Sequence, residues 1–266
     1  MKRAVICLGL ITACAAWAQE PPPERVTVPF SDPSRPKTVK VSLINGSITV
    51  NGYNGNQVVI EAQGEARRHR EAPEGMHRID TGIGLQAEES DNVVTIGAGP
   101  NHNGSLTLQV PVNTSLKLTS VNGGKIAVDG ISGDIEVNAT NGAVTVTHTS
   151  GSVIAEALNG RVTVVLDKVT PGKPMSFSSL NGNIDVTLPA DVKANVKMKS
   201  NNGEIFTDFD VHIEPSSRQP VVEGASGRGG RYRVRLDRTI SGTINGGGPE
   251  MQFTTLNGNI YIRKAK

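Results

Sequence analysis

Apolar and polar residues alternate with a period of two along most of the chain from Thr38 onward. The alternating runs are short, and Asn-Gly or Ser-Gly pairs separate them. This pattern is typical of β-strands with one buried face that are joined by tight turns. The best helical candidate, residues 61–74, contains Gly64 and Pro73, so we expect a loop or an irregular strand there. The pattern therefore predicts an all-β chain.

A nine-residue repeat lies at the centre of this pattern. Glycines recur every nine residues from Gly133 to Gly160, and apolar residues stand two and four positions after each of them. The spacing lengthens to 22 between Gly160 and Gly182, and to 21 between Gly182 and Gly203. A nine-residue unit is too short to bury its own apolar face, so we expect neighbouring units to stack.

Each unit begins at a predicted turn. Glycine adopts a positive φ without a Cβ clash, and asparagine tolerates one better than most residues. If the units stack, Asn141, Asn159, Asn181 and Asn257 form one column, in which their amides can make a hydrogen-bonded ladder. The predicted structural turn residues are Asn45, Gly46, Gly133, Asn141, Gly142, Gly151, Asn159, Gly160, Asn181, Gly182, Asn202, Gly203, Asn257 and Gly258.

Two architectures fit the repeat. One is a parallel β-solenoid with two nine-residue units in each flattened coil, and the other is an antiparallel β meander or sandwich with Asn-Gly hairpins. The longer spacings favour the solenoid, because a coil can absorb a longer loop while the next strand keeps its place. We expect one domain over 38–266, with variable insertions near 63–105 and 207–233. Its end strand, 259–263, is expected to be guarded by Lys264 and Lys266.

The first 18 residues are typical of a secretory signal peptide. Lys2 and Arg3 precede a mostly apolar run over 4–16, and residues 16–18 fit the small-x-small cleavage rule. Residues 19–37 are predicted to be an extended Pro-rich linker. A second interpretation stays open, since residues 11–14 resemble a bacterial lipobox in which Cys14 is the lipidation site. No apolar run is long enough for a transmembrane span.

Composition narrows the classes of function. Cys7 and Cys14 are the two cysteines, so cleavage after Ala18 leaves no disulfide and no thiolate metal site. Cleavage also removes Lys2 and Arg3, which takes Lys+Arg from 27 to 25 against 25 acidic residues, a net charge of zero. A neutral chain with 3% aromatic residues gives little support to nucleic-acid binding or to stacking of sugars.

Few residues suggest chemistry. The alternating Asp208, Asp210, His212 and Glu214 would share one strand face, but side chains two apart lie roughly 7 Å from each other, too far to meet at one ion. Four carboxylates could be placed on one solenoid face, as in solenoid polysaccharide enzymes, and these are Asp129, Asp134, Glu136 and Asp185. No catalytic motif is present. We expect no catalytic, cofactor-binding or metal site.

Two basic stretches have structural interpretations. Residues 67–70 include three arginines with glutamates nearby, which indicates a solvated insertion. Arg231, Arg233 and Arg235 alternate with apolar residues, which indicates an amphipathic strand with an arginine face.

Residues 43–50 (LINGSITV), the nine-residue units and residues 254–262 (TTLNGNIYI) resemble a bacterial putative-adhesin domain-of-unknown-function family of envelope proteins. The resemblance covers roughly residues 38–266 and implies a right-handed parallel β-solenoid outside the cytoplasm, without an established activity. We therefore expect an exported, non-catalytic, adhesin-like scaffold in the periplasm, on the outer-membrane surface or outside the cell. Its partner would be an unknown protein or glycan of the envelope. The alternatives are a polysaccharide-active enzyme and a lipid-anchored stress or signalling accessory.

Overall fold

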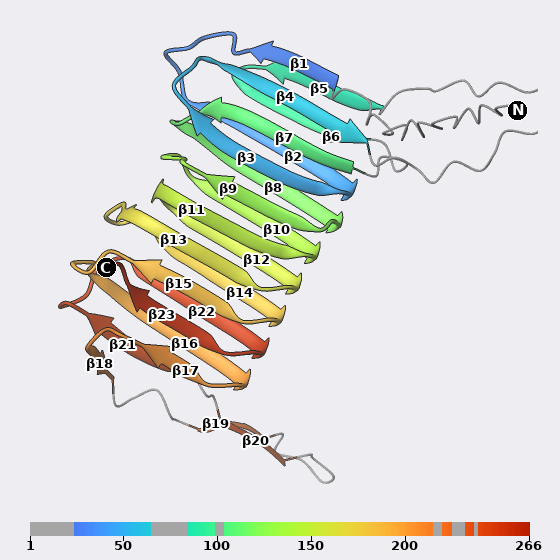
Figure 1. Cartoon of the computed structure of the whole chain (residues 1–266). Coiled ribbons are helices and arrows are strands. Elements are labelled where there is room, and N and C mark those ends of the chain that lie inside the picture. Colours follow the sequence, from blue (N-terminus) through green and yellow to red (C-terminus); the bar gives the residue numbers. More distant parts are fainter. Residues whose placement is uncertain (1–23, 65–83, 99–103, 215–219, 225–231, 237–238) are drawn as a thin grey trace, which may run out of the picture.

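The computed structural model describes residues 24–64, 84–98, 104–214, 220–224, 232–236 and 239–266 of the 266-residue chain. Every regular element within these ranges is a strand, which confirms the predicted all-β fold. Two large sheets face each other across one hydrophobic core, and a two-stranded sheet lies beyond one end (Figure 1). The signal peptide, Cys14 and the basic stretch 67–70 fall outside the described residues.

The strands of each sheet follow a spatial order that differs from their order in the chain. The ten-stranded sheet runs β1 (Glu24–Pro29), β4 (Gln57–Gly64), β7 (Gly104–Pro111), β3 (Ser47–Tyr53), β9 (Lys125–Asp129), β11 (Ala143–Gly151), β13 (Val162–Val169), β15 (Ile184–Leu188), β23 (Ile260–Lys264) and β17 (Ile205–Thr207). The eleven-stranded sheet runs β18 (Val211–Ile213), β21 (Ile240–Ile244), β16 (Ala194–Asn202), β22 (Glu250–Asn257), β14 (Met175–Asn181), β12 (Val153–Asn159), β10 (Ile135–Asn141), β8 (Thr114–Asn122), β2 (Lys37–Asn45), β6 (Val93–Ala98) and β5 (Leu85–Ser90). The small sheet pairs β19 (Pro220–Gly224) with β20 (Tyr232–Leu236).

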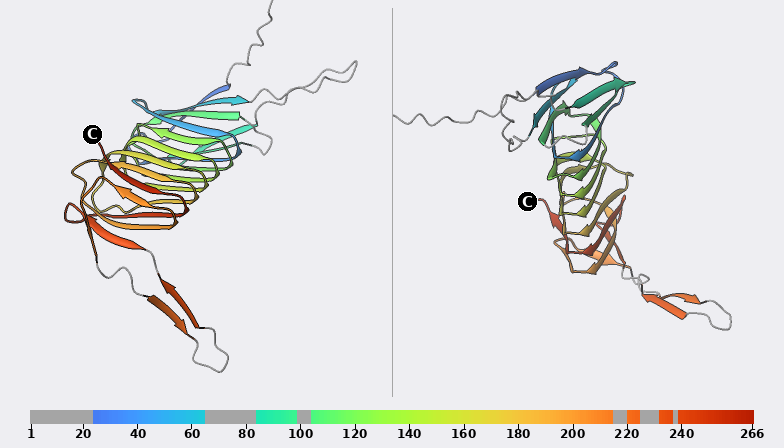
Figure 2. Two further views of the ribbon diagram at one scale, coloured as in Figure 1. Left: turned by 60° about the horizontal axis from the view of Figure 1, so that its bottom comes forward. Right: turned by 90° about the vertical axis from the view of Figure 1, so that its right-hand side faces the viewer.

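The centre of the molecule is a stack of coils. A coil consists of one strand from each large sheet, and the turn between them carries the Asn-Gly pair, as in β12 to β13 and β14 to β15. Equivalent strands of successive coils pair in parallel and in register, so that Val162 faces Ile184 and Ile184 faces Ile260. The two views in Figure 2 show these strands layered along the stack.

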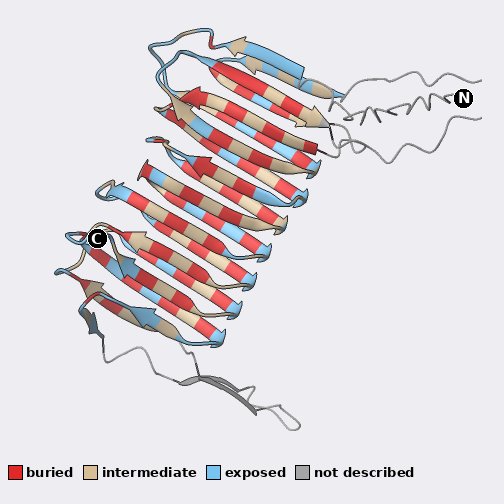
Figure 3. Ribbon diagram, in the orientation of Figure 1, coloured by how far each residue is buried: buried red, intermediate tan, exposed pale blue. Residues whose placement is uncertain are grey.

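Alternation of side chains builds the core. Along β13 and β15, buried positions such as Val164 and Val186 alternate with partly exposed Thr163 and Asp185 (Figure 3). Each fully buried Val or Leu side chain contributes about 1.5–3 kcal/mol through removal of apolar surface from water. Since a single coil cannot bury its face alone, the stacked coils share this stabilisation.

One coil lies out of chain order. The last coil, β22 and β23, inserts between the coil β14–β15 and the coil β16–β17. In the eleven-stranded sheet β22 pairs in parallel with β14 on one side and β16 on the other. The expectation that strand 259–263 ends the stack behind Lys264 and Lys266 is therefore wrong. The insertion is possible because every coil presents the same register, so a coil formed from the end of the chain fits between two coils that precede it in sequence.

Antiparallel strands close the ends of the stack. At the first end β4 pairs antiparallel with β7 and β1, and β5 pairs antiparallel with β6. At the other end β21 pairs antiparallel with β16 and β18. Parts of both predicted insertions thus form strands that cover sheet edges. The sheets are mixed, so an entirely parallel architecture does not describe the whole chain.

The prediction of an extended linker over 19–37 is wrong for residues 24–30. Residues Glu24–Pro29 form β1, which pairs along its length with β4, and Phe30 is buried in the core. The prolines at 29, 33 and 36 lie at or after the end of β1, so they leave residues 24–28 free to pair. The early part of the linker lies outside the described residues.

Candidate functional site

An amide ladder runs along one edge of the eleven-stranded sheet. Six asparagines, each the last residue of its strand, are joined by hydrogen bonds between side-chain amides. In spatial order they are Asn122, Asn141, Asn159, Asn181, Asn257 and Asn202, and the five N···O distances are 3.2, 3.0, 2.7, 2.7 and 2.8 Å. The ladder expected at four positions is present at those four and extends to two more. It ties each coil to the next at the turn.

The turn glycines are required for a reason that differs from the prediction. Gly142, Gly160, Gly182 and Gly203 do not have a positive φ. A Cβ on Gly160 would instead lie 1.9 Å from the carbonyl oxygen of Gly142, and one on Gly182 would lie 2.1 Å from that of Gly160. The backbones of successive coils approach so closely at this column that no side chain fits between them. Gly46 and Gly258 combine this close approach with a positive φ.

An aliphatic row lies next to the ladder on the outer face of the eleven-stranded sheet. The residue directly before each ladder asparagine points outward, and in three adjacent coils it is Leu158, Leu180 or Leu256. Their exposed fractions are between 36% and 44%, like those of Val121 and Ile44 further along the row. Neighbouring exposed aliphatic side chains of this kind often mark an interaction surface.

A groove of about 590 Å³ lies beside the three leucines on the same face. Its floor is the next outward row, in which Thr119, Asn138, Glu156, Ser178, Thr254 and Lys199 stand side by side on successive strands. Glu156 and Lys199 are the two charged residues of the floor. The groove is therefore lined by aliphatic, hydroxyl and amide groups, with one negative and one positive side chain.

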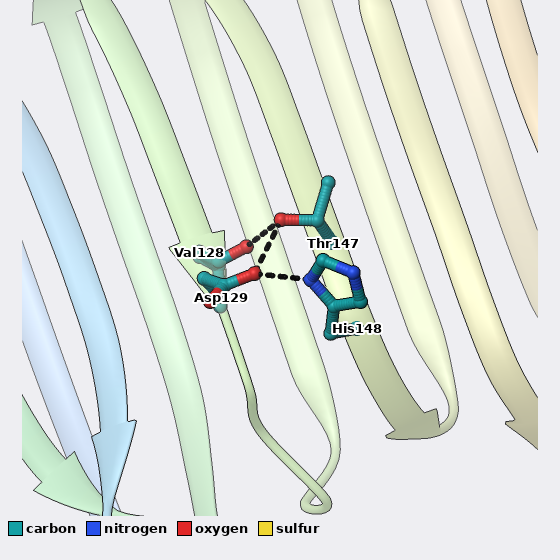
Figure 4. Close-up of polar contacts among 4 residues, drawn as sticks. All are labelled: Val128, Asp129, Thr147 and His148. Atoms are coloured by element: carbon teal, nitrogen blue, oxygen red, sulfur yellow. Dashed lines mark hydrogen bonds and ion pairs between the residues drawn. The ribbon is translucent and has the colours of Figure 1, made fainter.

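A second cluster lies on the ten-stranded sheet, at the end of β9 and in β11 (Figure 4). His148 Nδ1 lies 2.7 Å from Asp129 Oδ1, and Thr147 Oγ1 donates to the same oxygen at 2.7 Å. These two hydrogen bonds lower the pKa of Asp129, and Asp129 raises the pKa of His148. His148 has a positive φ of 49° at an irregularity in the pairing of β11 with β13.

The Thr147 hydroxyl and the His148 ring bind one shared carboxylate oxygen and not each other. Thr147 donates to the Asp129 carboxylate, with the Val128 carbonyl at 3.4 Å, and His148 binds the same carboxylate instead of the Thr147 hydroxyl. Because these contacts lower the pKa of Asp129, its carboxylate is a weaker base than a free aspartate. The Asp129 and His148 side chains are also more than half exposed. We interpret the cluster as an ion pair that holds the irregular segment of β11.

The four candidate carboxylates do not share a face, so that arrangement is wrong. Asp129 and Asp185 lie on the ten-stranded sheet, Glu136 lies on the eleven-stranded sheet, and Asp134 precedes β10. Each carboxylate pairs with a basic residue of another strand or loop: His148, Arg263, Lys117 and Lys173, respectively. The hydrogen bonds from Lys117 and Lys173 lower the pKa of Glu136 and Asp134. The cause of the separation is that consecutive strands of the repeat, such as β9 and β10, belong to different sheets.

The alternating segment 208–214 is not one strand. β17 ends at Thr207 and β18 begins at Val211, and Phe209 between them is buried. Among the described residues, no group of three or more His, Cys, Asp or Glu side chains is placed to hold a metal ion. Residues 232–236 form a strand as expected for the arginine-rich segment, and Arg231 lies outside the described residues.

Sequence reasoning missed the groove and one aromatic cluster. The signal for the groove was present, because an aliphatic residue precedes the ladder asparagine in several coils. The aromatic cluster stacks Phe206 on Tyr261, with ring centroids 5.2 Å apart, and Arg263 lies over the Tyr261 ring while it binds Asp185. This cluster depends on the inserted coil, because β17 and β23 are distant in sequence.

Comparison with known proteins identifies the family. A profile of the Toastrack DUF4097 family matches residues 36–246, most of the chain. The chain belongs to this family. The match confirms the resemblance to a family defined by a domain of unknown function, and it assigns no activity.

Comparisons with curated proteins and with solved structures do not extend the family assignment. No curated protein matches the sequence. The solved structure of a putative cell adhesion protein from Clostridium sporogenes is similar over 91% of this chain and 100% of that protein, with 11% identity and a TM-score of 0.43. A similarity at this level supports no conclusion about function. In the ranges that the structure describes, no helix has the length and apolar character needed to cross a membrane.

Proposed function

We propose that this Toastrack domain is a non-catalytic, exported envelope protein that acts as an interaction scaffold. Its coils form a parallel β-solenoid, of the right-handed kind that the family resemblance implies, and hold a binding face in a fixed shape. The observation that carries the proposal is the groove beside Leu158, Leu180 and Leu256 on the outer face of the eleven-stranded sheet. Its partner is a protein or glycan of the cell envelope.

The rigidity of this face supports a scaffold. The amide ladder, the parallel backbone pairing and the close glycine column all join the same successive coils. Side chains that are held on paired strands present a preorganised surface, which lowers the entropic cost of binding. The carboxylates that a polysaccharide-active enzyme would need are instead paired one by one with basic residues on separate faces.

Export and the lipid anchor belong to the proposal through the N-terminal sequence. Residues 1–18 are typical of a signal peptide, and Cys14 is the alternative lipidation site. The mass of the mature exported chain, measured together with membrane fractionation, distinguishes the two. A soluble chain that starts at Gln19 indicates simple secretion, whereas an acylated chain that starts at Cys14 indicates a lipoprotein.

The binding face is tested by substitution in the groove wall. Immobilised wild-type chain, Leu180→Asp and Leu256→Asp are exposed to a glycan array and to solubilised cell-envelope extract. We expect both variants to lose the binding that the wild type shows, because a carboxylate in the aliphatic row opposes desolvation of the face. Ile213→Asp, at an exposed position on β18 outside the groove, is the matched control and should bind as the wild type does. Binding that survives both leucine substitutions contradicts the proposal.

A further inference from the structure

The charges of the groove floor are arranged symmetrically about one boundary between strands. Four successive strands, β12, β14, β22 and β16, contribute Glu156, Ser178, Thr254 and Lys199 in register. The boundary between β14 and β22 divides this row into two halves with opposite charges at equal distances. Within the described part of the chain, Glu156 forms no ion pair.

A two-fold rotation about an axis at this boundary, parallel to the strands, makes the row complementary to itself. In a second copy placed face to face, the order of strands is reversed while positions along each strand are kept. Glu156 then faces Lys199 of the second copy, and Lys199 faces Glu156 of the second copy. Self-complementary patches of this kind are the defining feature of isologous dimers.

The aliphatic row obeys the same symmetry near the axis. Leu180 on β14 faces Leu256 on β22 of the second copy. By the same symmetry, Leu256 of the first copy faces Leu180 of the second. In the row on the other side of the floor, Ile154 is 46% exposed and comes to face Lys197 of the second copy, whose aliphatic stem can cover it. Packed sheets lie about 10 Å apart, a gap that a Glu and a Lys side chain from opposite sheets can span.

We infer that the groove of the eleven-stranded sheet is the interface of a two-fold dimer, in which the partner of the proposed scaffold is a second copy of this chain. The inference rests on the proposed function, because it names the partner of the face proposed there. The ten-stranded sheet and the β2–β6 end of the stack stay outside the contact, so they are free for other molecules.

Charge reversal tests the pairing directly. The mass and concentration dependence of the full exported chain are measured by sedimentation equilibrium for the wild type, Glu156→Lys, Lys199→Glu and the double variant. The wild type should dimerise, each single variant should weaken the dimer at least about tenfold through like charges, and the double variant should recover it. Lys40→Glu, an exposed reversal on β2 outside the contact, is the matched control.

Cysteine cross-linking gives a second test that is independent of charge. Glu156 and Lys199 are three strand spacings apart in one chain, about 14 Å, which is beyond the reach of a cross-linker of about 10 Å. With Cys7 and Cys14 replaced by Ala, a Glu156→Cys chain mixed with a Lys199→Cys chain should be joined into a dimer by a bismaleimide cross-linker with a reach of about 10 Å, the spacing of packed sheets. Either single variant alone should cross-link far more slowly. In the dimer, the two copies of the same position lie on strands that are three spacings apart across the interface.

The outcomes separate this inference from the proposed function. A wild type that stays monomeric throughout the concentration range overturns the dimer, and so does a double charge reversal that fails to restore association. If the chain is monomeric while Leu180→Asp still abolishes binding to the array or the extract, the scaffold function stands with a different partner. If Leu180→Asp changes neither association nor binding, both proposals fail.

Discussion

The side-chain amide of Asn257 donates a hydrogen bond of 2.7 Å to Oδ1 of Asn181, across 76 positions of sequence. Asn202 in turn donates to Asn257 at 2.8 Å. Asn257 therefore belongs to the rungs on both sides of the inserted coil, and the ladder is continuous only because β22 lies between β14 and β16. The same two hydrogen bonds provide a way to measure what the ladder contributes.

Asn257→Ala removes both rungs at once. A net contribution of about 0.5–1.5 kcal/mol for each hydrogen bond predicts a loss of about 1–3 kcal/mol in the free energy of unfolding, measured by urea denaturation. Asn138→Ala is the control, since within the described ranges the Asn138 amide bonds to Glu136 of its own strand and to no neighbouring coil. It should change stability by less than about 0.5 kcal/mol. Equal effects of the two substitutions would show that the ladder contributes nothing of its own.

Gly160→Ala tests the close approach of successive coils. The new Cβ would lie 1.9 Å from the Gly142 carbonyl oxygen, so the two coils must separate locally. We expect a loss of about 2–3 kcal/mol, in the upper range of overpacking effects, visible as a lower urea midpoint. Gly97→Ala is the matched control, because nothing lies within 4 Å of its Cβ position and its φ is not positive. If Gly160→Ala is as mild as Gly97→Ala, the column tolerates side chains and the argument from close approach is wrong.

Phe177 and Phe253 connect the inserted coil to its neighbour inside the core. Both rings are fully buried, with centroids 5.1 Å apart. Each Phe→Ala substitution should cost about 3–5 kcal/mol. The double variant should show a coupling energy of about 0.5–1.5 kcal/mol in a double-mutant cycle, because the second substitution removes a contact that is already lost. Strictly additive losses would mean that the two rings stabilise their coils independently.

The Asp129–His148 pair predicts a pH-dependent contribution to stability. The pKa of His148 is raised on folding, so its contribution is fully present below the ordinary pKa of about 6.5 and is lost as pH rises through the higher folded value. The pKa of Asp129 is lowered on folding, so its contribution is lost as pH falls through that folded value. The pair therefore stabilises the folded state most between the folded pKa of Asp129 and that of His148, in mildly acidic solution.

His148→Gln should consequently lower the melting temperature more at about pH 5 than at about pH 8. The expected difference is small, because both side chains are exposed to solvent. The Asp129→Asn variant is the control background: there His148→Gln should show no such dependence, because the carboxylate partner is absent. A His148→Gln effect that is the same at both pH values would exclude the ion pair as its cause.

The sequence pattern was sufficient for the turn positions of most coils, although the turn at Asn122 was not predicted, and it was not sufficient for the order of the coils. Asn159-Gly160 and Asn257-Gly258 were recognised as equivalent turns, and they do stand in one column. Nothing in the pattern distinguishes β16–β17, the next coil in sequence after β14–β15, from β22–β23, the next coil in space. Both present an asparagine and inward apolar residues. The antiparallel end strands escaped prediction for a related reason, since alternation marks a strand without stating its direction.

The candidate site shows a similar division. The acidic residues were visible in the sequence, but their partners were not: Lys173 reaches Asp134 from a loop 39 positions away, and Arg263 reaches Asp185 over 78 positions. The aliphatic row at Leu158, Leu180 and Leu256 was readable as a residue type next to each ladder asparagine. Its meaning as a surface needed the register of the coils, which places the three leucines side by side.

The insertion of β22–β23 makes the order of assembly differ from the order of synthesis. Residues 194–207 are synthesised before residues 250–264. In the stack, however, the coil formed by 194–207 lies on the far side of the coil formed by 250–264. Until the later coil arrives, the earlier one lacks its native neighbour, and such long-range closure slows folding. A nascent chain thus cannot place β16–β17 against its native neighbour before β22–β23 has been synthesised. Premature termination would leave β14–β15 and β16–β17 without their native neighbour, so incomplete molecules would be exposed to proteolysis.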